Sequence, residues 1–174
     1  MVFELFIWAG ANLGQLWLTR SAMDELDKLI LQTLQEDGRT TFTEIAKKAG
    51  VSETTIRSRY RNLAEEGIVR NVGIVDPYAL GFQAPAIIGV TVKPGMVDQV
   101  ARTIADLPEV SYLVMTLGRI DLIVEVFCRD LPHFTEFITQ QIQPIPGLLS
   151  IETLMIARSY KLSYCWSPNL DLEE

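Results

Sequence analysis

The 174-residue sequence has few of the side chains that form covalent cross-links and metal centres. It contains two cysteines, Cys128 and Cys165, in no C-x-x-C or paired spacing, and one histidine, His133. Small secreted scaffolds need several paired cysteines, and structural zinc sites need clustered cysteine and histidine. We therefore expect neither a disulfide scaffold nor a metal site.

Long uninterrupted apolar runs are also missing. Residues 2–18 are largely apolar but contain polar residues and glycines, and no basic cluster precedes them. A signal peptide has a positive start and a cleavage site, and a spanning helix needs roughly 20 mostly apolar residues, so we expect neither, and no membrane partner. We interpret 1–22 as an apolar extension that either packs on another surface or precedes a natural start at Met23. The second interpretation is favoured.

The overall composition is that of a folded chain with acidic balance. Hydrophobic residues make up 48% and charged residues 21%, and the formal net charge is −7. These values exclude a disordered chain, and the length allows one ordinary domain or two small ones. The charge argues against a protein that coats nucleic acid along its whole surface.

Residues 23–70 have the pattern of a helix-turn-helix domain. Leu26, Ile30 and Leu34 lie on one helical stripe, which ends near residues 36–39. Thr41 and Glu44 form a T-x-x-E capping box for a short second helix, which stops at Gly50. Ser52 is placed to cap a third helix that continues to Gly67. Two short helices joined by a three-residue turn containing glycine are typical of this motif.

The third helix separates an apolar face from a polar one. Ile56, Tyr60 and Leu63 share one side, at about 100° per residue, and should face the core. The opposite side carries hydroxyl, amide and guanidinium groups, which read base edges in the major groove. We therefore predict that this helix recognises double-stranded DNA.

The local charge supports the same prediction. Residues 39–61 contain six basic and two acidic side chains, although the whole chain is acidic. Basic groups are thus concentrated where phosphates would lie, whereas residues from 82 onward carry 11 acids and six bases. The predicted DNA-binding residues are Arg39, Lys47, Lys48, Ser52, Thr54, Thr55, Arg57, Ser58, Arg59, Arg61 and Asn62.

A linker and a second domain follow. Residues 67–70 and 73–75 could pair as a short wing, and the Pro/Gly pattern of 76–82 indicates a hinge, so we assign 71–83 as linker. The domain at 84–161 repeats a strand–helix–strand order. Its expected strands are 86–92, 110–117, 122–128 and 149–158, with helical stripes at Val97–Ile104 and Phe134–Ile142. This βαββαβ order predicts a ferredoxin-like domain and an α+β chain, followed by a tail at 162–174.

Both faces of the predicted sheet are apolar. In 110–117 and 122–128, large apolar side chains occur at odd and even positions alike. Two helices cover one face of a four-stranded sheet, so the other face needs a different cover. A second copy of the same sheet is the economical one, and the resulting homodimer would present paired recognition helices to two half-sites.

Several of these segments together resemble the Lrp/AsnC (feast/famine) transcriptional regulators. The resemblance rests on the helix from Ser52, the hinge at 76–82, the turn Gly118–Asp121 and the segment 145–161, and spans 23–161. It implies a helix-turn-helix joined to a ligand-sensing βαββαβ (RAM) domain, dimers that assemble into tetramers or octamers, and a cytoplasmic regulator without a cofactor. It also implies an amino acid or related metabolite bound near the G-x-x-D turn.

Carried onto this chain, the resemblance implies an effector site at the turn and the last strand. Its candidate residues are Thr116, Leu117, Gly118, Arg119, Ile120, Asp121 and Thr153. Asp121 would accept from a ligand ammonium, and Arg119 would pair with a ligand carboxylate or with a protein acid. Ordinary hairpin chemistry is the alternative explanation of Gly118 and Asp121.

An enzyme of the same architecture is the alternative function. Sirohaem decarboxylases share this two-part arrangement and carry a His-Asn-Tyr stretch in the sheet domain, where this chain reads VSYLVMT. His133 is expected to be exposed at the start of a helix, and Cys128 to be a core residue. No catalytic triad, Cys-His pair, phosphate-binding loop or carboxylate dyad appears, so we expect no catalytic residue.

Overall fold

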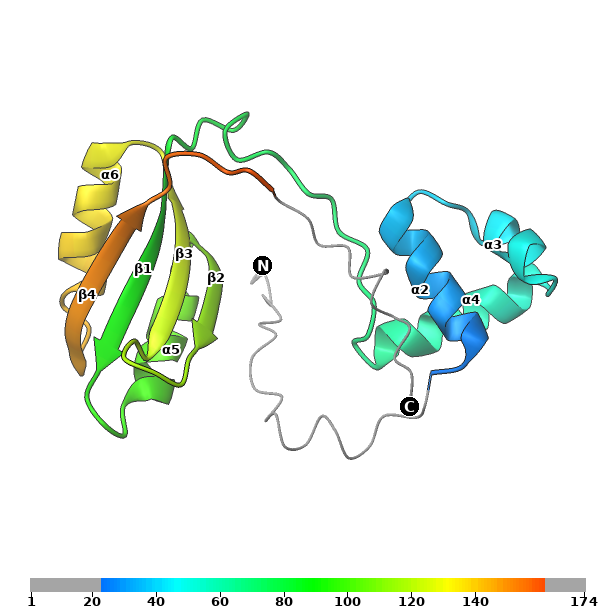
Figure 1. Cartoon of the computed structure of the whole chain (residues 1–174), viewed down its shortest axis with the longest axis horizontal. Coiled ribbons are helices and arrows are strands. Elements are labelled where there is room, and N and C mark those ends of the chain that lie inside the picture. The colour runs from blue at the N-terminus through cyan, green and yellow to red at the C-terminus, as the bar shows by residue number, and fades with distance from the viewer. Residues whose placement is uncertain (1–22, 162–174) are drawn as a thin grey trace, which may run out of the picture. The chain divides into compact units, whose positions relative to one another are not determined.

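The computed structural model describes residues 23–161, which form two compact units (Figure 1). The division falls between Gly73 and Ile74, inside the predicted linker. The interpretations of 1–22 and 162–174 lie outside the described residues.

The first unit contains three helices, α2 (Glu25–Glu36), α3 (Phe42–Ala49) and α4 (Glu53–Glu65). Capping boxes start two of them: Asp24 with Asp27 for α2, and Thr41 with Glu44 for α3. The core of this unit consists of one apolar stripe from each helix, with Ile30, Ile45 and Ile56 fully buried. The predicted wing is not formed, because the described residues 69–76 contain no strand.

The second unit has the predicted βαββαβ order. Its elements are β1 (Ala84–Val92), α5 (Val97–Ala105), β2 (Val110–Met115), β3 (Leu122–Cys128), α6 (Leu131–Glu136), the π-helical turn η1 (Phe137–Ile142) and β4 (Leu148–Met155). The sheet order is β2-β3-β1-β4, and all neighbouring strands are antiparallel. The helix expected at Phe134–Ile142 therefore ends in a π turn, in which the backbone N–H of Gln143 donates to the carbonyl of Ile138.

Helices cover one face of this sheet (Figure 1). Alternate residues of β3 (Leu122, Val124 and Val126) are fully buried in a single cluster with side chains of α5, α6 and η1. Phe137 of the π turn is fully buried in the same cluster. The core of the unit thus lies between the sheet and its helices.

The opposite face of the sheet is open in the single chain. Tyr112 pairs with Glu125, and Val114 pairs with Ile123, so these side chains share the face away from the helices. Leu154 of β4 lies on the same face, because it pairs with Ile87. Tyr112 is 56% exposed and Leu154 is 57% exposed. Half-buried and exposed apolar side chains therefore remain on this face.

Candidate DNA-binding helix and effector turn

The connection between α3 and α4 sets the position of the third helix. Gly50 ends α3 with φ of 69°, the left-handed conformation that glycine adopts most easily. Two residues later, the hydroxyl of Ser52 accepts from the backbone N–H of Thr55 at 3.1 Å. The Thr43 hydroxyl donates to Glu53 at 2.7 Å and so links α3 to the first turn of α4. The tight turn of a helix-turn-helix is present.

The faces of α4 are those that the sequence predicted. Ile56 and Leu63 are buried, and the Tyr60 ring packs at 5.1 Å from the ring of Phe42. The other face is exposed and carries Thr54, Arg57, Ser58, Arg61 and Asn62. Thr55 is half-buried and bonds to the capping Ser52. The predicted residues outside α4, namely Arg39 before α3 and Lys47 and Lys48 in α3, are exposed. Most of the predicted contact residues thus remain accessible.

Two arginines of this face pair with acids on their own helix. Arg57 Nη2 lies 2.7 Å from Glu53 Oε1, and its guanidinium lies 5.3 Å from the centre of the Phe42 ring. Arg61 Nε lies 3.9 Å from Glu65 Oε1. All four charged side chains of these pairs are substantially exposed, and such pairs are held weakly. A phosphate or a guanine edge can therefore replace the carboxylate partner.

Arg59 differs from the other predicted DNA-binding arginines. Its guanidinium lies against the amino-terminal end of α2, where it pairs with Asp24 and Asp27. The side chain is 40% exposed and belongs to the flank of α4 that faces α2. The charge of Arg59 is therefore paired with acids of its own unit.

The G-x-x-D turn is held by bonds to the neighbouring strand. The backbone N–H of Asp121 donates to the Val90 carbonyl at 2.9 Å, and the carboxylate of Asp121 accepts from the Val92 N–H at 2.7 Å. Thr116 closes the turn, since its N–H donates to the Asp121 carbonyl and its hydroxyl donates to the Ile120 carbonyl. Asp121 and Thr116 thus build the turn itself.

Side chains of the turn lie on the open face of the sheet or in solvent. A Cβ on Gly89 would approach Ile120 Cδ1 to 2.8 Å, so Ile120 packs directly on the glycine. Arg119 Nη2 lies 3.2 Å from Glu152 Oε2 on β4, with 84% of the arginine side chain exposed. Leu117 is 98% exposed, and a Cβ on Gly118 would meet no atom within 4 Å.

The predicted effector residues are only partly brought together. Residues 116–121 form one turn, and Arg119 connects it to Glu152. Thr153 follows Glu152 on the strand and pairs with the buried Ile88, so its side chain points toward the opposite face. The structure therefore separates Thr153 from Arg119 and Ile120.

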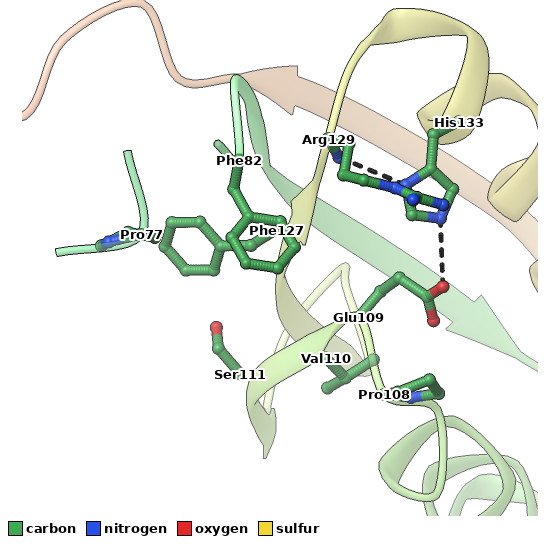
Figure 2. A pocket seen from close by; sticks show the side chains of 9 residues that line it. All are labelled: Pro77, Phe82, Pro108, Glu109, Val110, Ser111, Phe127, Arg129 and His133. Atoms are coloured by element: carbon green, nitrogen blue, oxygen red, sulfur yellow. Dashed lines mark hydrogen bonds and ion pairs between the residues drawn. The ribbon is translucent and has the colours of Figure 1, made fainter. Parts of the chain in front are cut away.

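A pocket of about 520 Å³ lies elsewhere in the sheet unit (Figure 2). Phe82 and Phe127 line it on one side, with Glu109, Arg129 and His133 on another. His133 Nε2 lies 3.2 Å from Glu109 Oε1, and Nδ1 accepts from the Arg129 N–H. The expectation of an exposed His133 is wrong, because its side chain is only 20% exposed. Glu109 and His133 are 24 residues apart in the sequence, so no local sequence pattern predicts this contact.

Cys128 is buried beside this pair. Burial, together with the charges of Glu109 and Asp130, raises the pKa of its thiol to about 11. The thiolate is the reactive form of cysteine, and it is scarce at neutral pH with such a pKa. The prediction of a core residue is confirmed.

Each of the two units matches a known protein domain family. The sequence matches the AsnC-type helix-turn-helix domain over residues 23–64 and the Lrp/AsnC ligand binding domain over residues 85–164. The chain belongs to the Lrp/AsnC family of transcriptional regulators. As expected, it is an α+β protein with a helix-turn-helix followed by a four-stranded antiparallel sheet.

Relatives in the Lrp/AsnC family align over most of the chain. An HTH-type transcriptional regulator of Pyrococcus furiosus is 37% identical over 143 residues, 82% of this chain and 97% of the relative. The regulator LrpA of Pyrococcus horikoshii is 34% identical over 140 residues, 80% of this chain and 99% of the relative. The structure of E. coli AsnC is 28% identical, with a TM-score of 0.76, and the match covers 83% of this chain and 99% of that one.

None of the helices at 23–161 is long and apolar enough to span a bilayer. The same residues contain no group of three or more His, Cys, Asp or Glu side chains arranged to hold a metal ion.

Proposed function

We propose that this Lrp/AsnC regulator binds a specific operator as a homodimer and that an amino acid or related small metabolite modulates this binding. The single observation that carries the proposal is the outward face of α4. It presents Thr54, Ser58 and Arg61 on a helix whose other side is buried. Such groups discriminate bases by hydrogen bonds in the major groove, roughly 1 to 3 kcal/mol for a bidentate pair.

The open face of the sheet supports a dimer. Tyr112, Val114, Ile123 and Leu154 share that face, and a second copy would remove them from water. A two-fold dimer pairs the recognition helices, which then read half-sites one helical turn or a multiple apart. We also propose that these dimers assemble further into tetramers or octamers, as the family resemblance implies.

The turn at 116–121 is our proposed effector site. One protein of the same fold, a Neisseria meningitidis transcriptional regulator, was solved with L-Met, at 24% identity and a TM-score of 0.73. The exposed Arg119 pairs only with the exposed Glu152 among the described residues, so a ligand carboxylate can take the place of that acid. We place the protein in the cytoplasm, where an operator and free amino acids are both accessible.

A decarboxylase-like activity has less support. The one histidine of the sequence bonds to Glu109 and to the backbone of Arg129. An enzyme that uses histidine on a tetrapyrrole would need that ring free. An absorbance scan of the purified protein checks this point, and we expect no pigment band.

DNA binding is tested by its dependence on salt. A duplex enriched from a random pool should bind more tightly than an unrelated duplex, and its affinity should fall steeply as salt rises from about 50 to 200 mM. A chain that binds neither duplex in dilute buffer would refute the proposal.

The effector is tested by a thermal-shift panel of the free amino acids. A ligand that binds only the folded protein raises the melting temperature with its concentration. We expect at least one amino acid to do so and to change the affinity for the enriched duplex. Arg119→Ala should abolish this response, and Arg102→Ala, on α5, is a matched surface control. A response that persists in Arg119→Ala would move the site elsewhere.

A further inference from the structure

Arg59 lies on a different side of α4 from the exposed residues that we propose to face DNA. It is three residues after the buried Ile56 and four before the buried Leu63, so it lies next to the apolar stripe. Its side chain is half-buried, whereas Arg57 and Arg61 are exposed. The sequence pattern groups these three arginines together, but in the structure Arg59 alone packs against α2.

The guanidinium of Arg59 spans two carboxylates of α2. Nη1 lies 2.8 Å from Asp24 Oδ2 and 3.3 Å from Asp27 Oδ2. The Asp27 side chain is only 13% exposed, so this contact is better shielded from water than the exposed pairs of Arg57 and Arg61. Among the described residues, these aspartates are the only acids with which Arg59 forms an ion pair.

The same two aspartates start the helix that Arg59 contacts. The Asp27 N–H donates to Asp24 Oδ1 at 2.9 Å, and the Asp24 N–H donates to Asp27 Oδ2. The Asp27 N–H, and after it the Arg59 guanidinium, holds the pKa of Asp24 below its ordinary value. The capping box of α2 therefore serves also as the acceptor for a cation of α4.

We propose that Arg59 is a positioning residue for DNA recognition: its ion pairs with Asp24 and Asp27 fix the orientation of α4 on α2 without contacting DNA. The inference rests on the proposed operator binding. A helix in the major groove must present its side chains within a fraction of an ångström to form bidentate bonds. Backbone phosphate contacts tolerate more variation, so loss of this clamp reduces specificity more than general affinity.

The charge of Asp24 makes the proposal testable. Asp24→Asn keeps a good helix cap, since asparagine caps as well as aspartate, but removes a negative charge from the DNA-binding unit. Electrostatics alone predicts tighter binding to every duplex after this change. The clamp predicts the opposite for the enriched duplex, because Arg59 loses an anionic partner.

The experiment measures the dissociation constants of the full chain for the enriched duplex and an unrelated duplex over a salt series. We expect Arg59→Ala and Asp24→Asn each to weaken binding of the enriched duplex by about tenfold, to leave the unrelated duplex within about twofold, and to keep the salt slope. Arg61→Ala is the matched control, whose loss comes from the DNA-facing side.

Other outcomes overturn the proposal. If Arg59 contacts phosphate, Arg59→Ala lowers the salt slope by about one and weakens both duplexes equally. If the ion pairs only stabilise the fold, melting falls while both affinities at low temperature stay unchanged. Arg59→Lys keeps the charge that pairs with both aspartates, so the clamp predicts that it discriminates between the two duplexes better than Arg59→Ala does. A folded Arg59→Lys that loses as much discrimination as Arg59→Ala rejects an ion-pair clamp, and Asp24→Asn provides the test if Arg59→Ala fails to fold. A wild-type chain that enriches no duplex rejects operator binding itself.

Discussion

The arginines on the polar face of α4, in the helical unit, and the carboxylate of Asp121, in the sheet unit, are engaged in different ways. In the helical unit, Arg57 and Arg61 pair with exposed acids on the same helix. In the sheet unit, the carboxylate of Asp121 accepts from the backbone N–H of Val92. An exposed ion pair can exchange one acid for another anion, whereas a backbone donor that loses its acceptor is left unsatisfied. The internal partner of a charged group therefore decides whether it is available to a ligand.

The same contrast extends to protonation. Hydrogen bonds from Asp27, Thr41 and Thr43 hold the pKa values of three carboxylates in the helical unit below their ordinary range, namely those of Asp24, Glu44 and Glu53. In the sheet unit, burial raises the pKa of Cys128 to about 11. Among the groups with a shifted pKa, those of the helical unit therefore respond to acid, and the one in the sheet unit responds to alkali.

Replacement of Asp121 is the strongest test of this comparison. Asp121→Ala removes the acceptor of the Val92 N–H, and an unsatisfied buried donor costs about 1 to 3 kcal/mol. We expect urea unfolding without DNA or amino acid to show this loss, and hydrogen exchange at Val92 to accelerate. Asp121→Asn keeps a side-chain oxygen and should lose less. Full stability in Asp121→Ala would show that the carboxylate is free for a ligand.

Removal of a helix cap tests the helical unit by a smaller amount. Thr41→Ala deletes the hydroxyl that accepts from the Glu44 N–H and donates to the Glu44 carboxylate. A lost cap of this kind costs about 1 kcal/mol. Hydrogen exchange at Ile45 should accelerate, and exchange at Val124 of the sheet should not. Thr41→Ser retains the hydroxyl and is the control. Equal acceleration in both variants would mean that the cap contributes nothing.

Local patterns of the sequence were sufficient for most of the fold. The caps at Thr41 and Ser52, the turn at Gly50 and the order of strands and helices in the sheet unit follow from short-range features, and all appear where they were predicted. The wing was wrong, since residues 69–76 contain no strand, and the π turn at Phe137–Ile142 has no marker in a stripe of apolar residues. Short apolar runs such as 67–70 fit a strand or a linker equally well.

The candidate sites were predicted less completely, because their long-range partners are not visible in a sequence. The faces of α4 follow from helical period, yet the pairing of Arg59 with Asp27, 32 residues earlier, depends on how α4 packs on α2. Thr153 was grouped with the turn by resemblance, and only the strand register places it on the other face. The Glu109–His133 pair likewise depends on tertiary packing.

Stability as a function of pH should separate the units. The three carboxylates of the helical unit have folded pKa values below their unfolded ones, so their contribution is present above about pH 4 and is lost as pH falls through the folded values. The folded pKa of Cys128 lies above its unfolded one, so that contribution is present below about pH 9 and is lost as pH rises toward 11.

Unit-specific hydrogen exchange measures this difference. Exchange at Ile45 should accelerate between pH-corrected measurements at about 7 and 3, and exchange at Val124 should accelerate between about 7 and 10.5. Glu44→Gln should flatten the acid response, and Cys128→Ala the alkaline one, whatever either change does to absolute stability. An acid response confined to Val124 would reverse the assignment.

The smallest effect on stability should accompany the largest effect on DNA. Arg57→Ala with Arg61→Ala removes two exposed ion pairs, so the free energy of unfolding should change by no more than about 0.5 kcal/mol. The same double variant should weaken binding of the enriched duplex by tenfold or more and leave the oligomer size unchanged. DNA titration measures the affinity, sedimentation measures the oligomer size, and urea unfolding measures the free energy of unfolding. If oligomer size fell while affinity stayed intact, the polar face of α4 would be a protein contact, and its exposed ion pairs would not be partners that DNA replaces.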